Sequence, residues 1–313
     1  MKISVFGLGY VGCVSVGCLA SSGHQIIGVD LNKKKVSQIN SGNPTIIEKD
    51  IGDIIFNQRN LKNIEATTNS IEAVQNTDVS IICVGTPSSK KGHLDFSALY
   101  SVAEDIGRAL KSKKSFHTIA IRSTIMPGQC NEISNIISKH SGKKMGKDYY
   151  VLSNPEFLRE GTAVEDYKNP PFILIGSENK KASKIISKMY NDINAEVIIV
   201  DVRVAELLKY VNNSFHALKV GFANEIGNIC KSLDVDSHKL MEIFIKDKDL
   251  NISPYYLKPG FAYGGSCLPK DLKALKTIAY DKYLSTPIIN SIEESNTFQI
   301  QRAFNIIKDI KIK

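Results

Sequence analysis

The sequence has no long apolar run and no segment that resembles a leader. No stretch approaches the roughly 18 to 20 consecutive apolar residues of a membrane span. Met1 also leads directly into an expected strand, without the basic region and cleavage site of a signal peptide. We therefore expect a cytoplasmic protein that has no membrane partner.

Cysteine is scarce and scattered. The six cysteines form no CxxC pair and have no histidine at metal-ligand spacing. This pattern argues against a metal site and against a disulfide framework, so reduced thiols are expected.

Dense clusters of positive charge with interleaved aromatic residues are also missing. The net charge is +8, but the lysines are spread along the chain, and the runs at 33–35 and 111–114 contain no aromatic residue. A lysine-rich solvated surface explains this charge, and no nucleic-acid partner is expected.

The chain does contain short apolar runs that alternate with helical stretches. The first 30 residues are typical of strand, glycine turn, helix and strand, which is a βαβ unit. Further apolar runs lie at 79–84, 118–122, 150–152, 172–175 and 197–200. This alternation predicts a Rossmann-type, mainly parallel α/β sheet covered by helices.

The pattern changes after residue 200. Residues 204–233 are expected to form one long helix, because they contain no proline and only two glycines. Helical segments follow, separated by a glycine-rich loop at 259–269. Since 313 residues exceed what one core usually serves, we predict a Rossmann domain over 1–200 and an all-helical domain over 201–313.

The segment GLGYVG at 7–12 matches GxGxxG directly after a strand and at the start of a helix. Glycines permit the tight turn and the close approach of a pyrophosphate, although such a turn can also serve packing alone. Asp30 ends the second strand, where a carboxylate accepts from ribose hydroxyls and repels a 2′-phosphate. NAD is therefore expected rather than NADP, although the lysines at 33–35 could neutralise a 2′-phosphate.

Two further strand ends carry small polar residues. CVGTP places Gly85 and Thr86 at the carboxyl edge of the sheet, and RSTIMPG places Thr124 at the same edge. Ligands of open α/β sheets bind at this edge, although either segment can also be a simple turn.

Cys267 lies in the segment GGSCLPKD, with Lys270 and Asp271 shortly after it. A thiol needs nearby positive charge to become a nucleophilic thiolate, and Lys270 or Lys209 can supply it. A lone cysteine is more commonly a small packing residue, but loops of glycine, serine and proline leave a cysteine accessible.

Polar side chains also recur on the expected long helix. Lys209, Asn213, His216 and Asn224 share one stripe at helical spacing. Such a stripe is either a solvated face or a set of donors to a developing oxyanion.

NPEFLRE, at 154–160, adds Glu156 and Glu160, which would share one face of a helical turn. They are candidate general bases or hold a water, and the alternative is an ion pair with Arg159 or a helix N-terminus.

These motifs, together with AELLKYVNNSFHALKVGFANEIGNI and PGFAYGGSCLPKDL, resemble the UDP-glucose/GDP-mannose dehydrogenase family over nearly the whole chain. The resemblance implies NAD-dependent oxidation of a nucleotide-sugar C6 alcohol to the acid, with two NAD per turnover, through a cysteine-bound thiohemiacetal and thioester. Family members that act on GDP-mannose are the most similar, and those that act on UDP-glucose or UDP-N-acetylhexosamines are the alternatives.

The resemblance also implies roles for individual residues. Residues expected to hold NAD are Gly7, Gly9, Tyr10, Val11, Gly12, Asp30, Lys35, Thr86, Thr124 and Lys270. Residues expected to hold the sugar nucleotide are Glu160, Lys209, Asn213, His216, Asn224, Tyr255, Tyr256, Lys258, Phe261 and Gly264. Residues expected to carry the chemistry are the nucleophile Cys267 and Lys209, Asn213, Asp271, Glu160, Glu156 and Thr124.

Two departures from the family pattern affect these expectations. Lys258 stands where GDP-mannose enzymes usually have arginine, and lysine lacks the bidentate fork. The family continues into a third, nucleotide-binding domain, whereas this chain stops at Lys313. The resemblance also implies a homodimer through the long helix. The competing hypotheses are a two-electron β-hydroxyacid dehydrogenase and a truncated, inactive NAD-binding or dimerisation module.

Overall fold

The computed structural model describes residues 1–88, 93–254, 257, 259–265 and 267–311. The chain divides into two compact units, Met1–Val211 and Asn212–Lys313. This division falls inside the long helix, and the functional boundary at residue 200 stays a prediction. In the described ranges, no helix combines the length and the apolar character that a bilayer crossing requires.

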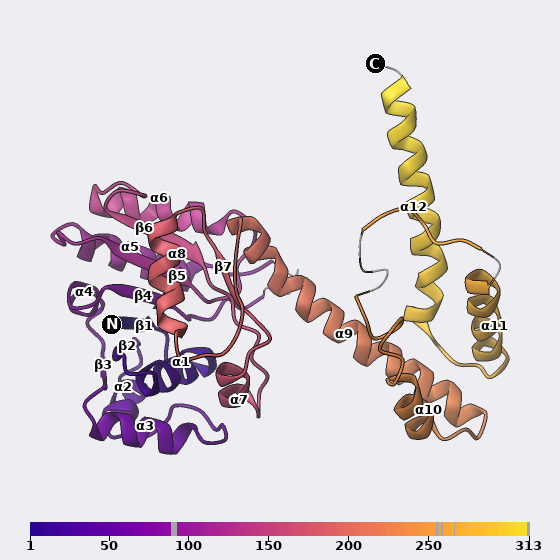
Figure 1. Cartoon of the computed structure of the whole chain (residues 1–313), viewed down its shortest axis with the longest axis horizontal. Helices are drawn as coiled ribbons and strands as arrows, with labels where there is room; N and C mark the ends of the chain where they lie inside the picture. Colours follow the sequence, from indigo (N-terminus) through magenta and orange to yellow (C-terminus); the bar gives the residue numbers. More distant parts are fainter. Residues whose placement is uncertain (89–92, 255–256, 258, 266, 312–313) are drawn as a thin grey trace. The chain divides into compact units, whose positions relative to one another are not determined.

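The first unit is built on one eight-stranded sheet with the order β3-β2-β1-β4-β5-β6-β7-β8 (Figure 1). Neighbouring strands are parallel except for β6 and β7, so the prediction of a mainly parallel sheet is confirmed. The strands are β1 (Lys2–Phe6), β2 (Gln25–Val29), β3 (Ile64–Thr67), β4 (Val79–Ile82), β5 (His117–Ile121), β6 (Tyr149–Ser153), β7 (Ile173–Gly176) and β8 (Val197–Val200).

Helices cover both faces of this sheet. Buried apolar side chains of α1, α2, α3, α7 and α8 form one core with the sheet, and those of α4, α5 and α6 form a second core. The helices of this unit are α1 (Tyr10–Ser21), α2 (Lys33–Asn40), α3 (Ile51–Asn60), α4 (Ser70–Gln75), α5 (Ser97–Leu110), α6 (Gln129–Ser141), α7 (Ala163–Lys168), α8 (Lys180–Ser187) and the short 3-10 helix η1 (Lys188–Tyr190).

A polar cluster lies buried within the sheet. The Ser80 hydroxyl lies 2.8 Å from Ser4 Oγ and 2.8 Å from His117 Nε2. Burial lowers the pKa of His117 to about 3, and the charge of Lys113 adds to the shift. The imidazole is therefore neutral in the folded protein.

The long helix α9 (Val202–Ser232) confirms the helix predicted over 204–233, and it runs through the division between the units. The described part of the second unit is helical, and it places Ile229, Ala279 and Ile289 in a small core. Its other helices are α10 (Ser237–Phe244), α11 (Cys267–Asp281) and α12 (Pro287–Lys311).

Two buried glutamates of α9 bind the N-termini of other helices. Glu206 accepts hydrogen bonds from Gly128 N at 2.6 Å and Cys130 N at 2.9 Å, at the start of α6. Glu225 accepts from Ile288 N and Ile289 N, at the start of α12. Each carboxylate satisfies amides that a helix cannot satisfy itself and lies at the positive end of the helix dipole.

Candidate active site

The glycine turn connects β1 to α1 with a backbone that excludes larger residues at two positions. Gly7 has φ +91°, and a Cβ there would lie 2.8 Å from the carbonyl oxygen of Cys83. A Cβ on Gly12 would lie only 1.7 Å from Gly7 O. The N-cap residue of α1, Gly9, provides no side-chain cap, so among the described residues the amides of the first turn are available for an anion such as a pyrophosphate.

Asp30 lies beside this turn, at the end of β2. Its Oδ2 accepts a 2.8 Å hydrogen bond from Leu8 N, and its Oδ1 accepts one of 2.8 Å from Asn32 N. Lys35 Nζ lies 3.5 Å from Oδ2. The structure thus brings the predicted acidic residue and Lys35 together next to the glycine turn.

Thr86 and Thr124 also lie together at the carboxyl edge of the sheet. Thr86 Oγ1 donates to Thr124 O at 2.9 Å, which joins the loop after β4 to the loop after β5. Because β1, β4 and β5 are parallel neighbours, these residues and the glycine turn share one edge. The residues present therefore fit a dinucleotide that lies across the switch point of the sheet.

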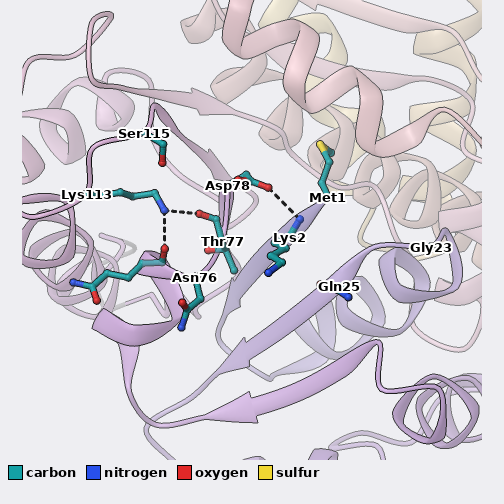
Figure 2. Close-up of a pocket in the computed structure, with 10 residues that line it drawn as sticks. Met1, Lys2, Gly23, Gln25, Asn76, Thr77, Asp78, Lys113 and Ser115 are labelled. Carbon is teal, nitrogen blue, oxygen red and sulfur yellow. Dashed lines mark hydrogen bonds between the residues drawn. The ribbon is translucent and has the colours of Figure 1, made fainter.

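A hollow at the opposite edge of the sheet does not belong to this site. It is lined by residues that include Lys2, Asp78 and Lys113, next to the amino ends of β1 and β4 (Figure 2). Lys113 Nζ donates to Thr77 O at 2.7 Å and to two carbonyls at the end of α4. Its ammonium group is thus used to stabilise the fold.

The two predicted glutamates of the 154–160 segment occupy different environments. Glu156 Oε1 forms a 2.9 Å ion pair with Lys209 Nζ, and both side chains are only about a tenth exposed. Glu156 Oε2 accepts from Leu158 N at 2.6 Å, and the ammonium lies 5.6 Å from the centre of the Phe157 ring. Glu160, by contrast, is exposed in a turn.

Glu156 and Glu160 therefore do not share one face of a helical turn. Residues 154–159 have no helical structure. The Asn154 amide donates to Ile121 O, and its side chain donates to Leu174 O, both at 2.9 Å. The residue before a proline is also disfavoured in helical conformation, which keeps this segment extended.

A buried arginine that the sequence analysis did not identify supports the same segment. Arg122 Nη1 donates to the Tyr190 hydroxyl at 2.9 Å, and this hydroxyl donates to Asn154 Oδ1. Burial acts to lower the pKa of Arg122, but nearby groups, with Tyr190 and Tyr167 the largest contributors, together outweigh it, and the pKa is raised. Arg122 directly precedes Ser123 in the RST motif, yet nothing in the local pattern predicts a contact with Tyr190.

Three of the predicted polar residues of α9 lie beyond Lys209 in the second unit. Asn213, His216 and Asn224 are exposed on the helix. Phe215 is also 44% exposed and Leu218 is 47% exposed. The middle of α9 therefore presents both polar and apolar side chains on its surface.

Cys267 is the first residue of α11 rather than part of a loop that extends to 269. Pro269 fits the first turn of this helix because proline needs no amide partner there. Cys267 is exposed, whereas Cys13, Cys18, Cys83, Cys130 and Cys230 are buried. Lys270 and Asp271 follow in the same turn, and Lys270 Nζ lies 3.5 Å from Asp271 Oδ1. A helix N-terminus stabilises a thiolate.

The loop before Cys267 is held by α12 through residues that no motif indicated. The Asn296 side chain accepts from Tyr263 N at 2.8 Å and donates to Tyr263 O at 3.0 Å. Gln299 Nε2 donates to Gly260 O. Phe261 and Gly264 lie exposed in this loop. Tyr255, Tyr256 and Lys258 lie outside the described residues.

A parallel sheet with this glycine turn and Asp30 at the end of β2 defines the class of dinucleotide-binding Rossmann proteins. Residues 1–194 match the NAD binding domain of the UDP-glucose/GDP-mannose dehydrogenase family, and residues 203–298 match its central domain. The chain belongs to this family of NAD-dependent nucleotide-sugar dehydrogenases. The predictions of an enzyme, of this family and of NAD as cofactor are therefore confirmed.

Individual relatives cover most of the chain. A GDP-mannose 6-dehydrogenase from Pseudomonas syringae pv. syringae is 45% identical over 98% of this chain and 70% of its own length. A crystal structure of a ternary complex of GDP-mannose dehydrogenase from Pseudomonas aeruginosa aligns with a TM-score of 0.97 at 44% identity, over 99% of this chain and 71% of that one. A UDP-glucose dehydrogenase from Pyrobaculum islandicum aligns with a TM-score of 0.77 at 32% identity, over 98% of this chain and 70% of that one.

Proposed function

We propose that this protein oxidises the C6 alcohol of GDP-mannose to the carboxylate. The observation that carries the choice of substrate is the likeness to GDP-mannose dehydrogenases, at 45% identity and a TM-score of 0.97. UDP-glucose and UDP-N-acetylhexosamines remain the alternative substrates, since a UDP-glucose dehydrogenase aligns with a lower TM-score of 0.77.

In this proposal, NAD is held at the carboxyl edge of the sheet. Amides of the turn over Gly7, Gly9, Tyr10, Val11 and Gly12 bind the pyrophosphate, and Asp30 accepts from the ribose. Lys35, Thr86, Thr124 and Lys270 complete the set that we assign to the cofactor. When bound, each NAD accepts one hydride, so oxidation of an alcohol to an acid uses two.

Cys267 carries the substrate between the two oxidations. The thiolate adds to the aldehyde carbon, a C–S bond forms, and the carbonyl oxygen takes up a proton. In the second oxidation this carbon loses a hydride, which the second NAD would accept, and its hydroxyl loses a proton, which leaves a thioester. Attack by water breaks the C–S bond and releases the acid and the thiol. The position of Cys267 at the start of α11 supports this role.

Charged and polar residues assist these steps. Lys209 is buried and paired with Glu156, so it supplies a fixed positive charge in a weakly solvated environment. We assign to Lys209 and Asn213 the stabilisation of the developing oxyanion, and to Glu156, Glu160, Asp271 and Thr124 the handling of water and protons. Residues assigned to the nucleotide sugar are Glu160, Lys209, Asn213, His216, Asn224, Tyr255, Tyr256, Lys258, Phe261 and Gly264.

The test combines substrate choice with replacement of the nucleophile. The protein is incubated with NAD and GDP-mannose, UDP-glucose or a UDP-N-acetylhexosamine, and NADH and the acid are measured. GDP-mannose should give two NADH per acid, and Cys267→Ser should abolish acid formation. Unchanged turnover by Cys267→Ser would favour a two-electron dehydrogenase, and NAD binding without NADH would favour an inactive module.

We also propose that the protein forms a homodimer through α9 and acts in the cytoplasm. Exposed apolar side chains on this helix, including Val211, Phe215 and Leu218, support association with a second copy. A reducing compartment would preserve the five buried thiols. Light scattering should give the mass of a dimer, and charged substitutions at Phe215 and Leu218 should yield monomers.

A further inference from the structure

The loop between α2 and α3, residues 41–50, is attached to the glycine turn at two points. Thr45 Oγ1 donates to Leu8 O at 2.8 Å. Glu48 Oε2 accepts a hydrogen bond from the Tyr10 hydroxyl, at the start of α1. Ile46 packs against the core beneath the loop. Glu48 is therefore fixed beside the turn that we assign to the cofactor.

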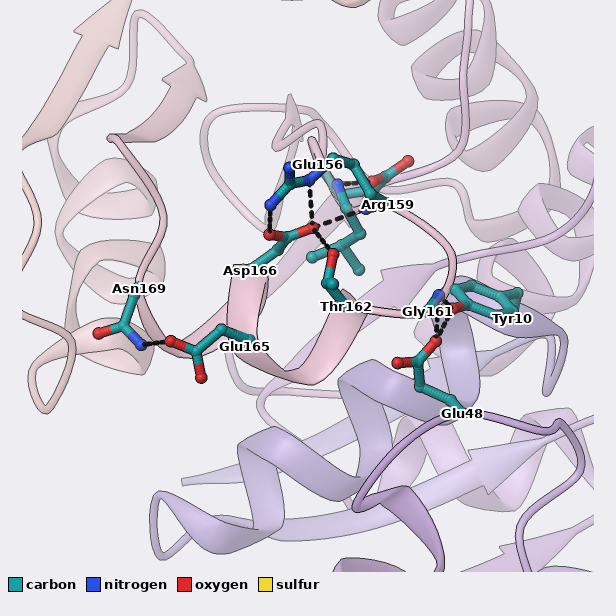
Figure 3. Close-up of polar contacts among 10 residues, drawn as sticks. Tyr10, Glu48, Glu156, Arg159, Gly161, Thr162, Glu165, Asp166 and Asn169 are labelled. Carbon is teal, nitrogen blue, oxygen red and sulfur yellow. Dashed lines mark hydrogen bonds and ion pairs between the residues drawn. The ribbon is translucent and has the colours of Figure 1, made fainter.

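The same carboxylate oxygen binds the segment that carries the two predicted glutamates. Gly161 N donates to Glu48 Oε2 at 2.8 Å and lies 3.1 Å from the Tyr10 hydroxyl oxygen (Figure 3). Gly161 has φ +88°, a conformation that favours glycine, and it directly follows Glu160. Toward its other end, the segment carries Glu156, which pairs with Lys209.

We infer that Glu48 is a positioning residue for the dehydrogenase reaction. Together with Tyr10 it attaches the 154–161 segment to the glycine turn, and so holds Glu156 and Glu160 in register with the cofactor site. This inference rests on the proposed function for the roles of the two glutamates. Glu48 is separated from both in sequence, and no motif led to it.

The environment of Glu48 explains why its charge matters. Its second oxygen, Oε1, is buried without a hydrogen-bond partner among the described residues. The contacts of Oε2 with Tyr10 and Gly161 are therefore the described interactions that offset burial of the carboxylate. Hydrogen bonds to a carboxylate are also stronger than those to a neutral amide.

The experiment compares amide hydrogen exchange in the wild-type protein, in Glu48→Gln and in Glu65→Gln. Glu65 is an exposed glutamate on β3 and gives a matched change of charge. Gly161 should exchange about 10-fold faster in Glu48→Gln, as expected for the loss of a charge-assisted bond, whereas β1, β4 and β5 should be unaffected. Glu65→Gln should match the wild type. Tyr10→Phe, which removes the other partner, should also accelerate Gly161.

Kinetics give a second measurement of the same role. Glu48→Gln should raise the KM for the nucleotide sugar by about 10-fold, and change NAD affinity less, because Glu48 acts through the segment rather than on the cofactor. An unchanged exchange rate at Gly161 in Glu48→Gln and in Tyr10→Phe would overturn the inference. Faster exchange throughout the sheet would also overturn it, because it would indicate a general loss of stability.

The exchange measurement needs no sugar substrate. If the wild-type protein forms no NADH with any nucleotide sugar, the proposed function fails, and exchange at Gly161 still decides whether Glu48 holds the segment. The two failures are thereby distinguishable.

Discussion

Gly9 and Gly12 belong to the same motif, but the structure predicts opposite consequences when a methyl group is added to each. In Gly12→Ala the new Cβ would lie 1.7 Å from Gly7 O and 2.9 Å from Gly7 C. Both contacts are with backbone, so the turn or α1 must move. In Gly9→Ala no atom of a described residue other than the two chain neighbours lies within 4 Å of the new Cβ, and the backbone φ of −81° suits alanine.

The energies separate the two variants. Alanine gains about 1 kcal/mol over glycine inside a helix, but overpacking typically costs about 1 to 3 kcal/mol and can cost more against backbone. We expect Gly12→Ala to lose about 2 kcal/mol net, which lowers Tm by about 4 to 8 °C for a unit of this size. Gly9→Ala should change stability by less than about 0.5 kcal/mol.

For cofactor binding, Gly9→Ala rather than Gly12→Ala is expected to have the larger effect. The methyl group of Gly9→Ala stands in the open space where the pyrophosphate would approach the first amides of α1. We expect the Kd for NAD to rise about 10-fold or more, because the phosphate loses charge-assisted hydrogen bonds.

Thermal unfolding followed by circular dichroism and calorimetric titration with NAD measure both quantities on the same samples. Binding of NAD by Gly9→Ala with the wild-type Kd, or wild-type stability of Gly12→Ala, would contradict these predictions. The first result would show that the pyrophosphate does not approach Gly9, and the second that the turn tolerates a methyl group at Gly12.

Three further predictions concern other parts of the first unit. The pKa of His117 is about 3 in the folded protein, whereas its ordinary value is 6.5. As the pH decreases, the unfolded state therefore takes up this proton before the folded state does. The free energy of unfolding should fall between pH 6.5 and pH 3, by about 2 kcal/mol at pH 5. Urea unfolding at pH 7 and pH 5 should show a smaller difference for His117→Gln, and an equal difference would contradict the assignment. Glu206→Ala leaves two amides at the start of α6 without their acceptor and should lower the free energy of unfolding by about 2 kcal/mol. Glu132→Ala, at an exposed position of the same helix, should lower it much less. Equal losses in urea unfolding would argue against the cap. Asp30→Ala should reduce the preference for NAD over NADP at least about 10-fold, measured as the ratio of the two Kd values, and an unchanged ratio would remove Asp30 from cofactor selection.

The sequence was informative where the relevant constraint is local. Gly7, Gly12 and Asp30 follow from a turn between two strands, and the structure brings them together as predicted. The long helix and most strands follow from periodicity. The strand β3 was missed because Ile64 and Ala66 alone give too short an alternation to distinguish it from a loop.

Contacts between distant segments were not predictable in the same way. The spacing of Glu156 and Glu160 would place both on one face of a helical turn, but hydrogen bonds of Asn154 to β5 and β7 hold the start of this segment against the sheet. The pairing of Glu156 with Lys209 and that of Glu48 with Gly161 depend on the fold of the chain. No residue pattern near Glu48 indicates its partner.

The distribution of cysteines allows one thiol to be labelled selectively in the folded protein. Five thiols are buried and Cys267 is exposed. Burial raises the pKa of Cys18 and of Cys83 to about 12, so these two remain protonated and unreactive at neutral pH. Alkylation of the folded protein should therefore mark Cys267, and mass spectrometry would measure the fraction of the chains in a preparation that carry a reactive Cys267 thiol.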